Sequence, residues 1–395
     1  MSELTQQLAS DLSKGNGTGP EWARALRDTA ATHFRAHGLP TRRDEAWKYT
    51  SLRVFEQRGL QLRGPAGAPG AQVARSESLL ATAYQVDMLD GLLAARHGRP
   101  PDGLTILPMA EALEQDNAAL RALLESLPTT TSADGFTSLN TATLERGLFI
   151  HVAAGMDAGS LALNWVAASH AEATLVNSRV CLVLEEGAGL QLFEQFGNDK
   201  GNNCNIVVQA ELAERAGLSH IRFQQEPDDS VLITRTEVSQ RSGSDYRYYG
   251  FDLGGGLVRH DLHASLLGTC AKAVLNGAYL LNGERHVDNH ARVDHVAPAC
   301  ASEQYFRGVA GGNSRAVFNT AVCVHPGADE TEASQSNANI LLSKMAEVNT
   351  KPELEIYADE VIASHGATVG QLDEQAVFYL RSRGLSDADA RQMLT

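Results

Sequence analysis

The chain has 395 residues, of which 33 are Lys or Arg and 48 are Asp or Glu, so its formal net charge at pH 7 is −15. Apolar residues make up 43% and charged residues 21%, a balance typical of a globular protein with a sizeable core. The acidic balance argues against binding to nucleic acid or to an anionic membrane surface, because both need a basic surface.

Targeting signals and membrane spans are not expected either. The first residues, MSELTQQLASDLSKGNG, are polar and do not resemble a secretory leader. The longest apolar stretch, Ser265 to Leu281, is interrupted by Lys272 and Asn276, so no membrane span is predicted. We therefore expect a cytoplasmic protein.

The cysteines indicate a reduced protein without a zinc ribbon, because none of them forms a CxxC pair. Three of them lie in apolar runs and are expected to be buried and inert, while Cys300 has the less apolar setting and is expected to be the more accessible thiol. The five are Cys181, Cys204, Cys270, Cys300 and Cys323, and the three in apolar runs are Cys181, Cys270 and Cys323.

Residues 1–147 read as helix and loop. Pro20 precedes apolar residues that recur every fourth position, and Gly38 follows them, which predicts an amphipathic helix between the two. Residues 62–75 are rich in Gly, Pro and Ala and indicate a flexible connection. Further helices are predicted over about 108–127 and about 137–145.

Residues 148–369 read as strands throughout. Apolar and polar residues alternate, as at Val208, Ala210 and Leu212, and glycine turn signals recur without a long helical pattern between them. This pattern alone leaves three architectures open: a β-sandwich, a barrel or propeller, and a β-solenoid.

Residues 370–395 turn helical again. One helix is predicted between Asp373 and Gly384, and the sequence Ser386-Asp387-Ala388-Asp389 resembles a capping box that opens a last helix. Such short helices are marginal without a partner surface.

Several histidines are candidate metal ligands. His286, His290 and His295 are the densest group; on a strand, His286 and His290 face one side and His295 faces the other, so three ligands on one ion would need a bend. The simpler interpretation is an exposed polar strand. His365 lies in a separate turn-like segment, IASHGATVG, where a neutral imidazole could bind iron or move a proton.

Three stretches resemble one known family. These are RRDEAWKYTSLR (42–53), VDNHARVDHVAPACASEQYFRGV (287–309) and the sequence from Gln335 to Ala390, and they are similar to motifs of the SufB/SufD family of iron–sulfur cluster assembly proteins. The SufD branch is the better match, because SufB proteins tend to have an acidic residue on each side of the histidine that corresponds to His365.

The resemblance implies a mainly β protein, with a right-handed parallel β-helix over 148–369 between helical regions at 1–147 and 370–395. It implies a non-catalytic scaffold of the SUF system that pairs with SufB through the β-helix and binds the ATPase SufC through its C-terminal helices. An iron–sulfur cluster or iron would be held transiently at the SufB interface, with no tightly bound cofactor in the isolated chain.

The resemblance also suggests site residues. His365 matches the family histidine proposed as a ligand of the cluster or of iron at the SufB interface. Apart from the resemblance, the spacing of His286 and His290 on one strand face keeps them as candidate metal ligands. The apolar residues expected to anchor SufC are Val377, Phe378, Leu380 and Leu385. Two departures matter: Ala363 stands where some relatives have a cysteine, and relatives usually continue well past residue 395, which would reduce the SufC surface if the shortening is native.

Two other functions stay open. A β-helix enzyme acting on polysaccharide would need paired carboxylates along a groove, but Glu185-Glu186 and Asp228-Asp229 lie at predicted turns. A purely structural homodimer could form through an exposed strand edge when no partner is present.

Overall fold

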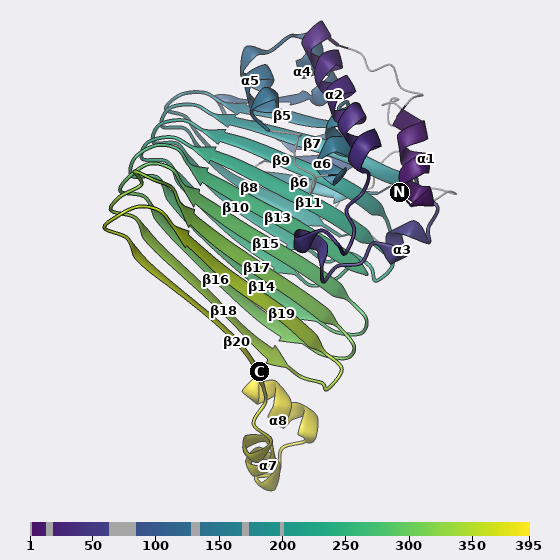
Figure 1. Ribbon diagram of the computed structural model, residues 1–395, viewed down its shortest axis with the longest axis vertical. Helices are drawn as coiled ribbons and strands as arrows, with labels where there is room; N and C mark the ends of the chain where they lie inside the picture. Colours follow the sequence, from purple (N-terminus) through teal and green to yellow (C-terminus); the bar gives the residue numbers. More distant parts are fainter. Residues whose placement is uncertain (1, 13–18, 63–83, 128–134, 168–173, 198–200) are drawn as a thin grey trace.

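The computed structural model describes residues 2–12, 19–62, 84–127, 135–167, 174–197 and 201–395. Between residues 147 and 371 the chain winds into a parallel β-solenoid, in which successive strands alternate between two long sheets (Figure 1). Of the three architectures compatible with the strand pattern, the solenoid is confirmed.

Each turn contributes one strand to each sheet, and all neighbours along the solenoid pair in parallel. The odd-strand sheet contains β5 (Gly147–Val152), β7 (Thr174–Leu184), β9 (Asn203–Leu212), β11 (Val231–Gln240), β13 (Leu257–Leu266), β15 (His286–His295), β17 (Arg315–Val324) and β19 (Glu347–Ile356). The even-strand sheet contains β6 (Asp157–Val166), β8 (Gly189–Phe196), β10 (Gly217–Gln224), β12 (Asp245–Asp252), β14 (Lys272–Leu281), β16 (Ala301–Ala310), β18 (Glu332–Leu341) and β20 (Ile362–Gln371).

The strands are two-faced because successive side chains point to opposite sides of a sheet. In β15, for example, Val287, Ala291 and Val293 are buried in the solenoid interior, while Arg292 between them is exposed. Stacking the turns places such inward residues in register and builds one continuous core cluster. This alternation is the pattern that predicted the strands.

Strands before residue 147 were not expected from the sequence. β2 (Tyr84–Leu89) joins the even-strand sheet beside β6 and pairs antiparallel with β3 (Leu92–Gly98), and β4 (Leu104–Pro108) pairs antiparallel with β5. The β2–β3 turn is Asp90-Gly91, and both residues have positive φ, as a tight hairpin turn requires. A short strand β1 (Gln61–Leu62) pairs with β7.

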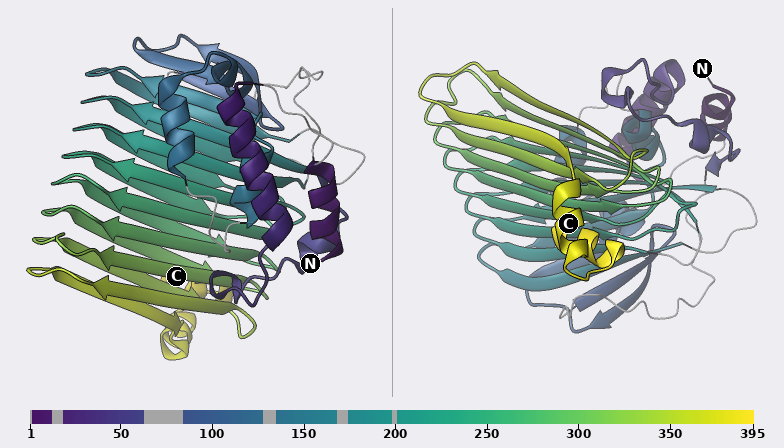
Figure 2. Two further views of the ribbon diagram at one scale, coloured as in Figure 1. Left: turned by 45° about the horizontal axis from the view of Figure 1, so that its top comes forward. Right: turned by 90° about the horizontal axis from the view of Figure 1, so that it is seen from below.

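Helices cover the outer face of the odd-strand sheet (Figures 1 and 2). The predicted helix after Pro20 is confirmed as α2 (Glu21–His37), which ends at Gly38 with φ of 72°. The others here are α1 (Glu3–Asp11), the 3₁₀ turn η2 (Glu45–Trp47), α3 (Arg53–Glu56), α4 (Met109–Glu114), α5 (Ala118–Ser126) and α6 (Gly135–Ala142).

The helix predicted over 108–127 is interrupted. Asp116 has a φ of 50°, which ends α4, and the Asn117 side chain then accepts hydrogen bonds from the backbone N–H groups of Ala119 and Leu120 to begin α5. The sequence therefore specifies two short helices joined by a turn, because Asp and Asn favour this local geometry over a continuous helix.

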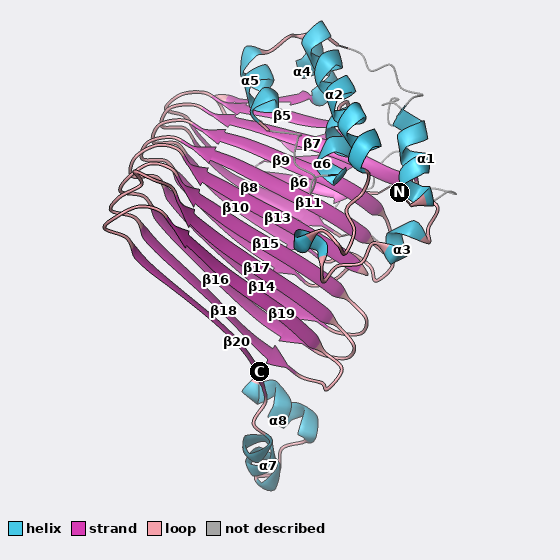
Figure 3. Cartoon of the chain, in the orientation of Figure 1, coloured by secondary structure: helices cyan, strands magenta, loops and turns pink. Residues whose placement is uncertain are grey.

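Two helices follow the solenoid and project from its last turn (Figure 3). α7 (Glu374–Ser382) begins at Asp373, whose side chain caps the N–H of Gln375, and α8 (Asp387–Leu394) begins at Ser386, whose hydroxyl accepts from the N–H of Asp389 at 3.1 Å. The predicted cap is confirmed.

Some expectations are not tested by this structure. Most of the predicted flexible connection at 62–75 lies outside the described residues, and a division of the chain into three domains stays a prediction. Within the described ranges, no helix is long and apolar enough to cross a membrane.

Candidate functional site

The two ends of the solenoid differ. At the first end, the antiparallel strands β3 and β4 each add a last strand to one of the two sheets. At the other end, β19 and β20 are the terminal strands, and no further strand of the described chain covers them. Nearly every residue of β20 is exposed, and among the described residues its only strand partner is β18. Ile362 is 71% exposed and Val369 is 44% exposed, so this end presents an apolar strand to solvent.

His365 lies on β20 at this open end. Its register partner in β18 is Gln335, whose own partner in β16 is Gln304, and both glutamines point into the solenoid and are buried. Residues in register share a face of the sheet, so His365 continues the inward-facing column of Gln304 and Gln335. It is exposed because no further turn covers this end of the solenoid. The sequence placed this histidine in a turn, but the structure places it within a strand.

Polar side chains continue behind His365 into the interior. Gln335 Nε2 donates to Thr320 Oγ1 at 3.0 Å, and the Thr320 hydroxyl in turn bonds the Gln304 side-chain oxygen. A second chain links Tyr279 with Asn339, and Asn339 Nδ2 donates to the carbonyl oxygen of Thr368 on β20 at 3.1 Å. Burial raises the pKa of Tyr279 to about 12, so its hydroxyl stays protonated and can donate.

Titratable side chains are buried deeper in the solenoid. His220 lies between Glu194, at 2.8 Å from Nε2, and the Tyr246 hydroxyl, at 3.2 Å from Nδ1. The Glu194 carboxylate also accepts from Trp165 Nε1 at 3.0 Å. Burial raises the pKa of Tyr246 well above its ordinary value, which keeps it a neutral hydrogen-bonding partner.

A polar bridge crosses the interior, from an ion pair within the even-strand sheet to Asn289 in the odd-strand sheet. Arg222 on β10 donates to Asp252 on β12 at 2.7 Å, and Asp252 also accepts from Asn289 on β15 at 3.0 Å. Burial alone would lower the pKa of Arg222, but Asp252 and its neighbours raise it above its ordinary value, so the guanidinium remains charged. The interior is therefore polar along part of its length and is not filled by aliphatic side chains alone.

His260 adds a neutral imidazole to this interior. Its Nδ1 is 2.7 Å from the Thr234 hydroxyl, and its ring stacks on Tyr248 with centroids 5.4 Å apart. Burial lowers the pKa of His260 well below 6.5, and the nearby cation Arg222 lowers it further. The ring is uncharged at neutral pH.

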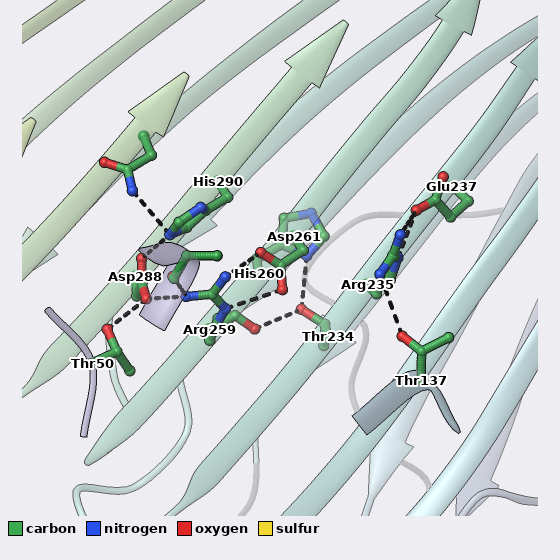
Figure 4. A network of polar contacts seen from close by, with 12 residues as sticks. Thr50, Thr137, Thr234, Arg235, Glu237, Arg259, His260, Asp261, Asp288 and His290 are labelled. Carbon is green, nitrogen blue, oxygen red and sulfur yellow. Dashed lines mark hydrogen bonds and ion pairs between the residues drawn. The ribbon is translucent and has the colours of Figure 1, made fainter. Parts of the chain in front are cut away.

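His286 and His290 face the outer side of β15, as the sequence predicts, but their side-chain partners differ. His286 Nε2 is 3.1 Å from the Thr50 hydroxyl. His290 Nε2, in contrast, is 2.8 Å from Asp288 Oδ1 and 3.3 Å from Asn319 Nδ2 (Figure 4). His295 faces inward and bonds Ser302 at 2.8 Å. Metal binding by His286 and His290 stays a prediction.

These outer residues belong to a network that docks the N-terminal motif (Figure 4). Arg259 donates to Asp288 at 2.6 Å, to Asp261 at 2.7 Å and to the carbonyl oxygen of Ala46 at 2.7 Å, and its guanidinium lies 4.0 Å from the centre of the Trp47 ring. Although burial opposes ionisation, Arg259 and His290 hold the pKa of Asp288 well below its usual range. The network gives the motif RRDEAWKYT a structural role.

One group of potential metal ligands was not anticipated from the sequence. Asp294, Cys323 and His325 each offer one ligand atom, and the three atoms lie within 4.8 Å of one another. The spacing Cys-x-His at 323–325 was an available signal, because residues two apart on a strand share a face. Cys323 is buried, as its apolar run predicts. The expectations for two other cysteines are wrong: Cys270 is exposed, because it lies in a turn with a φ of 59°, and Cys300 is buried.

The four apolar residues predicted to bind SufC occupy different environments. Val377 is buried between α7 and α8, and Leu380 and Leu385 are half-buried, whereas Phe378 is 71% exposed. Tyr379 and Met393 are also exposed and add apolar surface to the same helical pair, which was not foreseen.

Comparison with known proteins agrees with the geometry. Residues 166–395 match the family model described as "SUF system FeS cluster assembly, SufBD core domain". The iron–sulfur cluster assembly SufBD family protein slr0076 of Synechocystis is 31% identical over 386 residues, covering 93% of this chain and 84% of that protein. The iron–sulfur cluster assembly protein SufD of Escherichia coli is 30% identical over 364 residues, covering 90% and 83%.

Proposed function

Because the chain belongs to the SufB/SufD family of iron–sulfur cluster assembly proteins, we propose that it is a SufD-type scaffold subunit of the SUF machinery. In this role it pairs with SufB, binds the ATPase SufC and has no turnover of its own. The nascent iron–sulfur cluster, or the iron for it, is the cargo of the complex. The family match and the SufD relative support this assignment, and we place the protein in the cytoplasm.

The observation that carries the SufB proposal is the open last turn. β20 ends the even-strand sheet with one edge lacking a strand partner in the described chain, and Ile362 and Val369 add exposed apolar side chains there. A strand edge of this kind pairs readily with another chain. A partner built on the same solenoid plan would continue the stack and cover it.

His365 is the side chain proposed to meet the cargo at this surface. It lies on the exposed strand, over the interior column that contains Gln335 and Gln304, and Ser364 and Gly366 on either side are small. With Ala363 in place of a cysteine, this segment supplies nitrogen and no sulfur, so thiolates would come from SufB. A mixed set of imidazole and thiolate ligands suits iron.

SufC binding is assigned to the α7–α8 pair. Phe378, Tyr379 and Met393 are exposed on it, which is the usual character of an apolar helix face that docks on a partner. Since Val377 lies inside the pair, substitution there would damage the helices themselves. Phe378→Asp is therefore the sharper test, and Met393→Asp tests the neighbouring helix; loss of SufC co-purification is expected for Phe378→Asp.

The experiment for the main proposal is anaerobic co-expression with SufB and SufC. The wild-type chain is compared with His365→Ala and with His37→Ala, a control on the exposed surface of α2, and the readouts are complex mass and iron–sulfur absorbance. We expect both variants to assemble, and only His365→Ala to lose most of the cluster absorbance.

Two results would contradict this. If His365→Ala assembles and carries a full cluster, the histidine is structural and the chain only holds its partners in place. If the wild-type chain does not associate with SufB at all, the scaffold assignment itself is wrong.

The polysaccharide-enzyme alternative gains no support from the geometry. Glu185 is bound to His151 at 2.9 Å, and Asp228 is bound to Arg285 at 2.7 Å, both at turns of the solenoid. The homodimer alternative is compatible with the open β20 edge, and it would describe the isolated chain without excluding the scaffold role.

A further inference from the structure

We propose that Asp294, Cys323 and His325 form a binding site for a divalent transition-metal ion of borderline softness, Zn²⁺ or Fe²⁺, on the outer face of the odd-strand sheet. The site is separate from His365, which belongs to the even-strand sheet. It does not depend on the proposed scaffold function, because it concerns binding by this chain alone.

The strand order brings the three residues together. Asp294 and Cys323 are register partners on β15 and β17, and both point outward, so their side chains are direct neighbours across the sheet. His325 follows Cys323 by two positions and leaves β17 on the same side. Its backbone is fixed by hydrogen bonds from its N–H to His295 and from Ala328 to its carbonyl.

The distances are close to those of a bound ion. All three ligand atoms lie within 4.8 Å of one another, and His325 Nε2 is already 3.7 Å from Asp294 Oδ1. Around tetrahedral zinc, ligand atoms 2.0–2.3 Å from the metal are separated by about 3.5 Å from each other. The required closure is about an ångström, and the His325 side chain, 41% exposed, can rotate to provide it.

A fourth oxygen stands next to the site. Glu355 on β19 is the register partner of Cys323, so its carboxylate lies on the same outer face beside the thiol. Thiolate, imidazole and carboxylate together form a donor set that suits Zn²⁺ or Fe²⁺, whereas Mg²⁺ and Ca²⁺ prefer oxygen alone. On binding, the metal replaces the thiol proton, which passes to solvent.

One side chain from the neighbouring strand and one from β15 itself hold Asp294 in place. His263 Nε2 on β13 is 2.8 Å from one carboxylate oxygen, and Arg292 Nη2 is 2.8 Å from the other. His263 is in turn bound to Glu237 on β11 at 2.9 Å. Such outer contacts orient a ligating carboxylate. Arg292 balances Asp294 in the metal-free protein and, being 44% exposed, can move into water when a cation arrives.

The test uses Co²⁺ alone as a spectroscopic probe of the purified full-length chain, followed by displacement with Zn²⁺. We expect one Co²⁺ per chain, with a thiolate-to-cobalt charge-transfer band that Zn²⁺ abolishes. Cys323→Ser should remove the band, and His325→Gln should weaken Co²⁺ binding by about tenfold or more. Cys270→Ser, at an exposed cysteine, is the matched control and should keep the band.

Three results would overturn the proposed metal site. A missing band in the wild-type chain, or a band that survives Cys323→Ser, would overturn the site. His325→Gln alters a partly exposed residue, so unchanged affinity in this variant would also overturn it even if Cys323→Ser failed to fold. His365→Ala should retain Co²⁺ binding, so failure of the scaffold proposal would not be confused with failure of this one.

Discussion

Asp288 shows how a single buried charge can fix a remote segment of the chain. It is contacted by Arg259 from the neighbouring strand and by Thr50, 238 positions earlier in the sequence. Such an ion pair is costly to desolvate, but removing one partner is costlier still, because the other is left buried and uncompensated.

We therefore expect Asp288→Asn to lower the free energy of unfolding by about 3–5 kcal/mol. Urea denaturation of the variant and the wild-type chain would measure this. The matched control is Asp245→Asn, which breaks an exposed pair with Arg247 and should cost no more than about 1 kcal/mol. Equal losses in the two variants would contradict the role assigned to burial.

His260 provides a pH-dependent test of the interior. Its pKa in the folded state is well below 6.5, so the unfolded chain binds a proton that the folded chain does not as the pH falls below about 6.5. Stability is unaffected by this group above that pH and falls below it, by up to about 1.4 kcal/mol per pH unit.

His260→Asn should reduce that acid sensitivity between about pH 6.5 and pH 5, while retaining a hydrogen-bonding atom near Thr234. Denaturation curves at several pH values provide the measurement. An unchanged slope of stability against pH would show that His260 is protonated in the folded protein or contributes nothing.

At the scale of elements, the α7–α8 pair is held together by few buried side chains. Val377 and Ala390 are its fully buried residues, so we expect Val377→Asp to unfold the pair, since burying an unpaired carboxylate costs more than two short helices can supply. Limited proteolysis should then cleave after residue 373, with the thermal unfolding of the solenoid unchanged. Phe378→Asp, on the exposed side, should leave the pair protected.

Some of the strands and helix boundaries can be predicted from the sequence, and others cannot. Alternation along residues 148–369 predicted the strands because each has one buried and one outer face. β2 was missed although Tyr84, Val86 and Met88 alternate with Gln85 and Asp87, because only one short run of this kind stands in a region otherwise read as helix and loop. The Asp90-Gly91 dipeptide is itself a sequence signal for the β2–β3 hairpin turn. The break between α4 and α5 depends on the positive φ of Asp116, and the periodicity of apolar residues does not reveal the backbone angle of a single residue.

The candidate sites divide in the same way. His365 was a candidate from its own segment, and the resemblance to family motifs gave it a role, but only the strand register shows that it faces the interior column. Asp294 and Cys323 lie side by side because they are one full turn of the solenoid apart. The number of residues in a turn has to be known to predict this pairing, and the sequence alone does not reveal it. Thr50 and Asp288 are 238 positions apart in the sequence, so no local pattern of residues predicts their contact.

At the scale of the whole molecule, the open last turn predicts self-association of the isolated chain. Exposed apolar residues gather there, including Ile356, Tyr357, Ile362 and Val369. Sedimentation at increasing concentration should show a dimer, and Ile362→Lys with Val369→Lys should raise its dissociation constant at least about tenfold, as charged residues block edge pairing.

Leu280→Lys is the matched control, because Leu280 is 54% exposed on β14, away from the end of the stack. It should leave the dimer unchanged. A chain that stays monomeric at all concentrations would show that the β20 edge is protected in solution.

The near absence of buried side chains in β19 and β20 has a consequence for motion. In a stack where each turn rests only on its neighbours, the end turn frays first, and its amides should exchange with solvent faster than those of β13 or β15. A subunit that covers this turn would order it and bring His365 to a single position. The histidine proposed to meet the cargo would then be fully set only in the assembled complex, so that assembly itself acts as the switch.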